Sequence, residues 1–182
     1  MTKAKVKALF QALEDRDLDA VRRTLDEHPD AREVRGVGKA LFEDKTPLMY
    51  ALQCSNAPAA DLLLDRGADV HARMATSWQW PALHFAVRAA AAGVGTSENL
   101  RILERILSLG ADANVKDAFG NGALDRALMD YDKVSDHVRV IELLLGAGAD
   151  PDALGASKST ARQVVQNNPH AYTGAVRRLF AG

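Results

Sequence analysis

Five histidines and one cysteine are the residues of this sequence best suited to acid–base, nucleophilic or metal chemistry. The histidines, which lie far apart, are His28, His71, His84, His137 and His170. None of them is paired with a second histidine or with the cysteine at the spacing of a metal ligand set. Cys54 has no histidine near it in the sequence that could activate its thiol. The sequence therefore predicts no catalytic residue and no metal site.

The glycine-rich and acidic stretches do not form a cofactor or catalytic motif either. Gly93-Val94-Gly95 lacks the preceding strand and the further glycine of a dinucleotide-binding loop, so we interpret it as a turn. Asp15, Asp17 and Asp19 surround an expected turn and helix start, where carboxylates accept hydrogen bonds from free backbone N–H groups. We therefore expect no cofactor and no enzymatic activity.

The composition is that of an ordinary folded domain. The chain has 182 residues, 47% of them hydrophobic and 26% charged, which predicts one domain over residues 1–182. A net charge of −1 gives no overall attraction to nucleic acid or to an anionic membrane. With one cysteine, no intramolecular disulfide can form, and we expect a reducing, cytoplasmic location. We expect no signal peptide and no membrane-spanning segment, because no run approaches about 18 apolar residues. The excess of arginine over lysine favours a bacterial source.

A short motif recurs after three apolar helical stretches. Its copies are Gly67-Ala68-Asp69, Gly110-Ala111-Asp112 and Gly148-Ala149-Asp150. A glycine after such a stretch is typical of a helix C-cap, because it adopts the left-handed conformation that a Cβ disfavours by about 1–2 kcal/mol. The aspartate suits the tight turn that follows, where its carboxylate can accept from backbone N–H groups. The motif therefore indicates an internal repeat.

Pairs of short amphipathic helices account for the chain between these motifs. The expected units are approximately 4–35, 36–71, 72–114, 115–152 and 153–182. In the first unit the apolar spacing predicts helices over Lys5–Glu14 and Leu18–Glu27. In the second, Thr46 is a natural N-cap and Pro47 fits the first helical position. A second helix over Ala59–Arg66 completes that unit.

The second unit carries both halves of a known repeat signature. Its Thr46-Pro47-Leu48-Met49-Tyr50-Ala51, followed by Leu-Leu-x-x-Gly-Ala-Asp, resembles the ankyrin repeat. The third unit keeps the leucine, histidine and alanine of the signature, so the resemblance implies a structural role for His84. The resemblance implies an all-α solenoid of about five repeats with degenerate end caps, built from ten helices in stacked antiparallel pairs. We expect the chain to be monomeric on its own.

The units are longer than the family's period of about 33 residues, so they contain insertions. In the third unit we expect residues 87–92 to prolong the first helix, residues 93–96 to loop out and Ser97 to cap the next helix. In the fourth unit the extra length is expected around residues 131–134. Long finger-like turns are expected at 30–45 and 70–80.

The resemblance also implies where a partner would bind. Ligands of the ankyrin family usually meet the fingers and the inner face of the first helices. On this sequence those positions hold Arg73, Trp78, Trp80, Arg88, Phe119, Asn121, Met129 and Asp130. Tryptophan and arginine are frequent interface anchors. The alternative for Trp78 and Trp80 is that they pack against a neighbouring finger or helix.

Three functions remain open from the sequence. The resemblance favours a non-catalytic module that binds another protein through its fingers and concave face. A narrower alternative is a dedicated inhibitor, such as an immunity protein that neutralises a bacterial toxin or effector enzyme. The third alternative is a small-ligand binder or an enzyme, which the absence of a catalytic motif disfavours.

Overall fold

The computed structural model describes residues 1–37, 42–91, 96–129 and 137–181. Within these ranges it contains ten α-helices and a 3-10 helix, η1 (Pro29–Glu33). The α-helices are α1 (Lys3–Glu14), α2 (Leu18–Glu27), α3 (Pro47–Gln53), α4 (Ala57–Asp65), α5 (Ala82–Ala91), α6 (Thr96–Ser108), α7 (Ala123–Met129), α8 (His137–Gly146), α9 (Ala161–Asn167) and α10 (Gly174–Leu179). The expected all-α fold is confirmed, since the described segments form isolated β-bridges but no strand.

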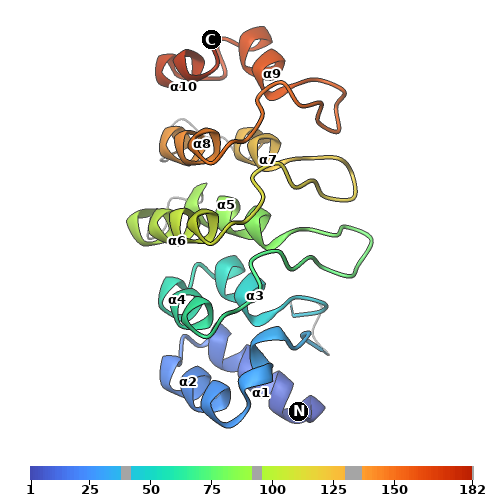
Figure 1. The fold of residues 1–182 in the computed structure, drawn as a ribbon, viewed down its shortest axis with the longest axis vertical. Helices are drawn as coiled ribbons and strands as arrows, with labels where there is room; N and C mark the ends of the chain where they lie inside the picture. Colours follow the sequence, from blue (N-terminus) through green and yellow to red (C-terminus); the bar gives the residue numbers. More distant parts are fainter. Residues whose placement is uncertain (38–41, 92–95, 130–136, 182) are drawn as a thin grey trace.

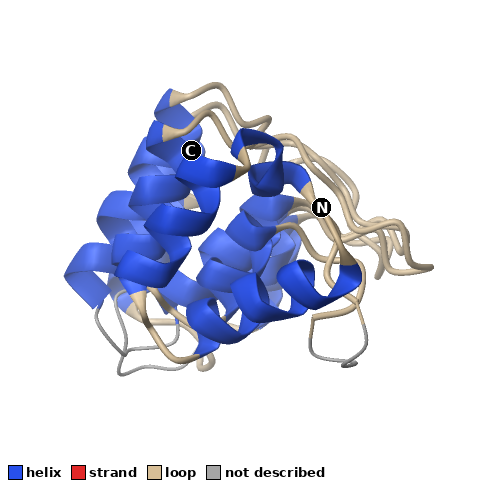
Figure 2. Cartoon of the chain, turned by 90° about the horizontal axis from the view of Figure 1, so that it is seen from below, coloured by secondary structure: helices blue, strands red, loops and turns tan. Residues whose placement is uncertain are grey.

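The helices stack in chain order as two layers (Figure 1). Each odd-numbered helix packs on the even-numbered helix that follows it, and successive odd-numbered helices also contact one another. We call α1, α3, α5, α7 and α9 the first-helix layer and the other five α-helices the second-helix layer. The turns that precede the first helices project together to one side of the stack (Figure 2). The expected solenoid of stacked helix pairs is therefore confirmed.

One hydrophobic core runs through the stack, from Val6 in the first helix to Phe180 near the C-terminus. Ala51, Ala86 and Ala127 are almost completely buried in the first-helix layer, where a small side chain allows neighbouring helices to approach closely. The leucines and isoleucines of the second-helix layer fill the remaining space. A single helix pair could not bury such a face alone, so each pair is stabilised by its neighbours.

The glycine motif acts as the sequence predicts. Gly67, Gly110 and Gly148 follow α4, α6 and α8 with φ angles of 74°, 90° and 87°, in the left-handed region. The aspartate of each copy accepts a hydrogen bond from the backbone N–H two residues later. These pairs are Asp69 with His71 at 2.8 Å, Asp112 with Asn114 at 2.9 Å, and Asp150 with Asp152 at 2.9 Å. The three copies therefore share one turn geometry.

The expected start of α3 is also present, and α9 begins with a side-chain cap of the same kind. Thr46 caps α3 by accepting from the backbone N–H of Met49, and Pro47 is the first helical residue. Thr160 and Gln163 form a reciprocal capping box at the start of α9, with N–O distances of 3.1 and 3.0 Å. These caps satisfy backbone donors that the first turn of a helix leaves free.

Several boundaries differ from the sequence-based expectations. Ser97 does not cap α6, because that helix already begins at Thr96. The expected finger at 30–45 begins with η1, which the fixed φ of Pro29 helps to start. α5 extends to Ala91, in line with the expected prolongation. Of the expected loop at 93–96, Thr96 is already helical and residues 93–95 lie outside the described residues, as does the expected insertion at 131–134.

Ion pairs connect neighbours in the second-helix layer. Asp61 of α4 accepts from Arg101 and Arg105 of α6, and the Arg105 pair has an N–O distance of 2.7 Å. Burial acts to raise the pKa of Asp61, but the hydrogen bonds from the two guanidinium groups outweigh it and hold the pKa below its ordinary value. Asp26 of α2 pairs in the same way with Arg66, which follows α4, at 2.7 Å. These ion pairs therefore lie in the second-helix layer, whereas the projecting turns lead into the first-helix layer.

Candidate functional site

Four fingers precede α3, α5, α7 and α9, and each is named here after the helix that follows it. They comprise residues 34–37 with 42–45, then 71–81, 113–122 and 151–160. Each finger turns at one residue with positive φ. These residues are Asp44 at 64°, Gln79 at 46°, Gly120 at 88° and Lys158 at 58°. Gln79 therefore takes the position and the left-handed conformation that a glycine occupies in the α7 finger.

Hydrogen bonds join each finger to the next. The backbone N–H of Thr76 donates to the Asp44 carboxylate at 2.5 Å. The N–H of Ala118 donates to the carbonyl of Trp78 at 3.1 Å. Lys116 donates its ammonium group to the carbonyl of Leu154 at 2.8 Å. The row of fingers is consequently held in one arrangement before any partner binds, which lowers the entropy lost on association.

Aromatic rings meet across the α5 and α7 fingers. Trp78 stands edge-on to Phe119, with ring centroids 5.5 Å apart, and edge-on to Trp80 at 6.0 Å. Trp80 in turn stands edge-on to Phe85 of α5 at 5.5 Å. We call Trp78, Trp80, Phe85 and Phe119 the aromatic ridge. Such edge-to-face pairs are a favoured arrangement of aromatic rings and fix the side chains relative to one another.

Four of the eight contact residues expected from the sequence have exposed side chains. Trp78 is 53% exposed, Phe119 is 56% exposed and Met129 is 60% exposed. Arg88 is exposed on α5, next to the aromatic ridge. These four are available to a binding partner.

Three of the other four expected residues are engaged in contacts within the stack. Trp80 is half-buried, with the Arg126 guanidinium 4.3 Å from its ring centroid. Asn121 is buried and donates its side-chain amide to the Asp117 carboxylate at 3.1 Å. Arg73 donates to the carbonyl of Lys116 at 2.5 Å, which links the α5 and α7 fingers. Asp130 lies outside the described residues. The first three side chains therefore stabilise the fingers themselves.

A hollow of about 240 Å³ opens beside the aromatic ridge. It is lined by Lys45, Gln53, Met74, Trp78, Trp80, Phe85 and Arg88. These residues come from the α3 finger, the α5 finger, α3 and α5. Sequence reasoning missed Lys45, Met74 and Phe85. Lys45 is next to a predicted N-cap and Phe85 is on an apolar helix face, positions that give no sign of lining a surface hollow. Met74 lies in the expected finger at 70–80, but not at a position that the resemblance assigns to contact. We call this site the ridge hollow.

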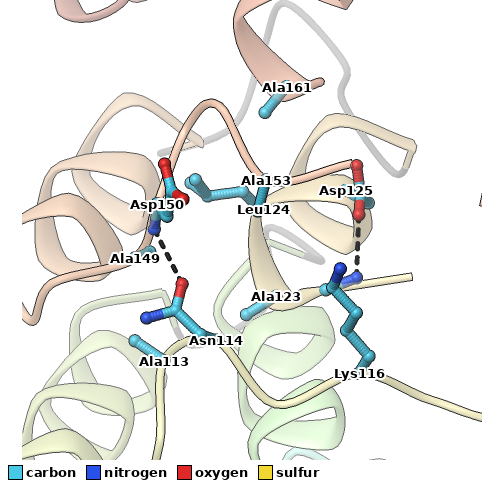
Figure 3. A pocket seen from close by; sticks show the side chains of 11 residues that line it. Ala113, Asn114, Lys116, Ala123, Leu124, Asp125, Ala149, Asp150, Ala153 and Ala161 are labelled. Carbon is cyan, nitrogen blue, oxygen red and sulfur yellow. Dashed lines mark hydrogen bonds between the residues drawn. The ribbon is translucent and has the colours of Figure 1, made fainter. Parts of the chain in front are cut away.

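A second, much smaller space lies between the last three helix pairs (Figure 3). Its volume of about 20 Å³ is enough for about one water molecule, so it is a packing gap. Beside it, the Asn114 side chain accepts from the N–H of Asp150 at 2.7 Å and donates to the carbonyl of Gly148 at 2.8 Å. The Asp125 carboxylate accepts from the N–H of Gly122 at 2.8 Å. The Asn114 bonds connect neighbouring units, whereas the Asp125 bond lies within one unit, at the start of α7.

Two side chains that could take part in acid–base or nucleophilic chemistry, those of His84 and Cys54, are packed within the stack. His84 is buried, its Nε2 lies 3.3 Å from the carbonyl oxygen of Val115, and burial lowers its pKa to about 4. Burial also raises the pKa of the Cys54 thiol, which disfavours the thiolate needed for nucleophilic attack. In the part of the chain that the structure describes, no group of three His, Cys, Asp or Glu side chains could hold a metal ion.

These features define a solenoid of helix pairs whose projecting turns are joined to one another by hydrogen bonds. The family model for ankyrin repeats (3 copies) matches residues 9–117. The chain therefore belongs to the ankyrin-repeat family. A comparison with curated proteins found no similar sequence. Ankyrin repeats generally mediate protein–protein interactions and are typically non-catalytic.

None of the described helices is long and apolar enough to cross a membrane.

Proposed function

We propose that this protein binds a partner protein across its fingers and first helices, with the α5 finger near the centre of the interface. The observation that carries the proposal is the exposed pair of Trp78 and Phe119 on adjacent fingers. Large contiguous apolar patches are uncommon on the surface of soluble monomeric proteins and often mark interaction sites. Aromatic side chains also supply a large contact area with few rotamers to immobilise, which suits an interface anchor.

The proposed contact surface is narrower than the sequence suggests. Trp78, Phe119, Arg88 and Met129 form it, since their side chains are exposed. Trp80 packs edge-on against Trp78 and restricts the orientation of its ring. We propose further that residues 1–182 act as one domain of five units, because the helix pairs stack in order around a continuous core.

The test is affinity purification from the native source with the wild-type chain, Trp78→Ala and Phe119→Ala as baits. Leu109→Ala is a matched control, because Leu109 is 50% exposed and follows α6 in the other layer. A partner recovered with the wild type is then titrated by calorimetry. Replacing a true anchor by alanine should cost about 2 kcal/mol, roughly thirtyfold in affinity.

Thermal melts of the same variants separate binding from folding. We expect both aromatic variants to melt close to the wild type, since exposed ring atoms contribute little to the core. Full affinity in Trp78→Ala and Phe119→Ala would place the interface elsewhere. Loss of affinity together with an equal loss of thermal stability would show that the rings are structural.

The narrower function of a dedicated inhibitor is tested on the same partner. If that partner is an enzyme or a toxin, its activity is measured with and without an equimolar amount of this chain. Inhibition that Trp78→Ala abolishes supports the inhibitor function, whereas an unchanged activity supports a scaffolding function. A toxin gene beside the gene for this chain would favour the inhibitor.

A further inference from the structure

The ridge hollow combines apolar walls with a cationic rim. Met74, Trp78, Trp80 and Phe85 supply the apolar walls, and Arg88 stands on the rim. Its volume of about 240 Å³ is below the roughly 300–1,000 Å³ of pockets that hold small-molecule ligands. The hollow also opens on the surface proposed to meet a partner protein. Its size and position therefore suit one side chain of that partner.

The charges at the hollow favour an acidic side chain. Among the described residues, no carboxylate lines the hollow, and none of them forms a hydrogen bond or ion pair with Arg88. Lys45 contributes a second positive charge, which the nearby Asp44 and Glu43 balance in part. Among the described residues that line the hollow, the Arg88 guanidinium is thus the charged group with unused donors. Planar guanidinium groups bind carboxylates through two parallel hydrogen bonds.

The apolar walls favour glutamate over aspartate. A glutamate side chain has a longer methylene stem, which can lie against the rings of Trp78 and Trp80 while its carboxylate reaches Arg88. A basic side chain would meet the positive charge of Arg88 without a carboxylate to offset it. A phosphorylated side chain usually requires a cluster of arginines, whereas one arginine is found among the described residues that line this hollow.

We propose that the ridge hollow is the anchor site for a glutamate side chain of the partner protein, with its stem on the aromatic ridge and its carboxylate on Arg88. This inference rests on the proposed function, because it assumes that a protein segment crosses the α5 finger. It adds the chemistry that the partner must present, namely an acidic residue within an otherwise apolar contact.

The probe is a set of peptides selected from a random phage-displayed library on the immobilised full chain. We expect selection to enrich peptides with a glutamate beside apolar residues. Each enriched peptide is synthesised together with a twin in which the glutamate is replaced by glutamine. Both are titrated by tryptophan fluorescence, because the two tryptophans of the chain line the hollow and report occupancy directly.

The peptide and its twin are compared on the wild type, on Arg88→Gln and on the control Arg139→Gln, whose arginine lies on α8 in the second-helix layer. The glutamine twin should bind the wild type and Arg139→Gln on the order of tenfold more weakly than the glutamate peptide. On Arg88→Gln the two peptides should bind equally. High salt should weaken the glutamate peptide more than its twin. Arg88→Gln should melt like the wild type, since Arg88 is exposed.

Two results overturn the inference while the proposed function stands. In the first, the enriched peptides carry no acidic residue, yet they bind the wild type and do not bind Trp78→Ala. The other is a glutamate peptide and twin of equal affinity on the wild type. Peptides that bind Trp78→Ala and Phe119→Ala as tightly as the wild type would contradict both the inference and the proposed function. Failure to enrich any peptide would overturn the glutamate anchor.

Discussion

Trp78 of one finger stands edge-on to Phe119 of the next, with ring centroids 5.5 Å apart and an angle of 76° between the planes. The contact joins two units through side chains that also face solvent. An edge-to-face pair of this kind contributes about 0.5–1.5 kcal/mol beyond the area that it buries, and exposure places this pair near the lower end. The two fingers should therefore be energetically coupled.

The first prediction is a coupling free energy of about 0.5 kcal/mol between Trp78 and Phe119. It is measured by urea denaturation of the wild type, Trp78→Ala, Phe119→Ala and the double variant. In a control cycle, Leu154→Ala is combined with Trp78→Ala in place of Phe119→Ala. Leu154 is exposed in the α9 finger and should show no coupling to Trp78. Additive effects of Trp78→Ala and Phe119→Ala would mean that the two fingers are independent.

The second prediction concerns the repeated glycine cap. Gly110 has a φ of 90°, and no atom lies within 4 Å of a Cβ placed on it, so a substitution there is opposed by the backbone conformation alone. Gly110→Ala should lower the free energy of unfolding by about 1 kcal/mol. Gly146, at the end of α8, also has open space, and Gly146→Ala should raise the free energy of unfolding by about 0.5 kcal/mol. Equal effects of the two substitutions in urea denaturation would contradict this explanation.

The third prediction concerns the shared core. Leu144 of α8 is fully buried in the stack. Leu144→Ala should lower the free energy of unfolding by about 2–5 kcal/mol, because it removes buried methyl groups and leaves a cavity. Leu109→Ala changes the same atoms at a site that is 50% exposed and should have an effect within about 0.5 kcal/mol. A loss under about 0.5 kcal/mol for Leu144→Ala would contradict its placement in the core.

The fourth prediction is a pH dependence from His84. Burial lowers its pKa in the folded state from 6.5 to about 4. Between these values the unfolded chain binds more protons, so the free energy of unfolding rises with pH across this window. Acidification from pH 6.5 to 4 should therefore cost about 3 kcal/mol from this residue, at about 1.4 kcal/mol per pKa unit.

The variant that isolates this contribution is His84→Gln, whose side-chain amide can still donate toward the carbonyl of Val115. Its free energy of unfolding should vary less with pH between 4 and 6.5 than that of the wild type. His71→Gln is the control, because His71 is exposed in the α5 finger. Parallel pH profiles for His84→Gln and the wild type would show that His84 is not buried in the neutral form.

The periodic features of the fold could be predicted from the sequence. Gly67, Gly110 and Gly148 marked the helix ends because few other residues tolerate a left-handed conformation. Thr46 and Pro47 marked the start of α3 because their chemistry suits a first helical turn. Both signals are local, so they act in the same way wherever the segment lies. Boundaries without such a signal, including the start of α6 at Thr96, were less accurate.

The sequence by itself determined the class of fold and the positions of the fingers, through local caps and repeated apolar spacing. Only the tertiary structure decided which finger residues face outward. Trp78 and Trp80 are two residues apart and similar in chemistry, yet Trp78 is exposed while Trp80 lies against Phe85 and under Arg126. Phe85 and Arg126 come from two different first helices. Exposure at this site therefore depends on how neighbouring units stack, which no local segment encodes.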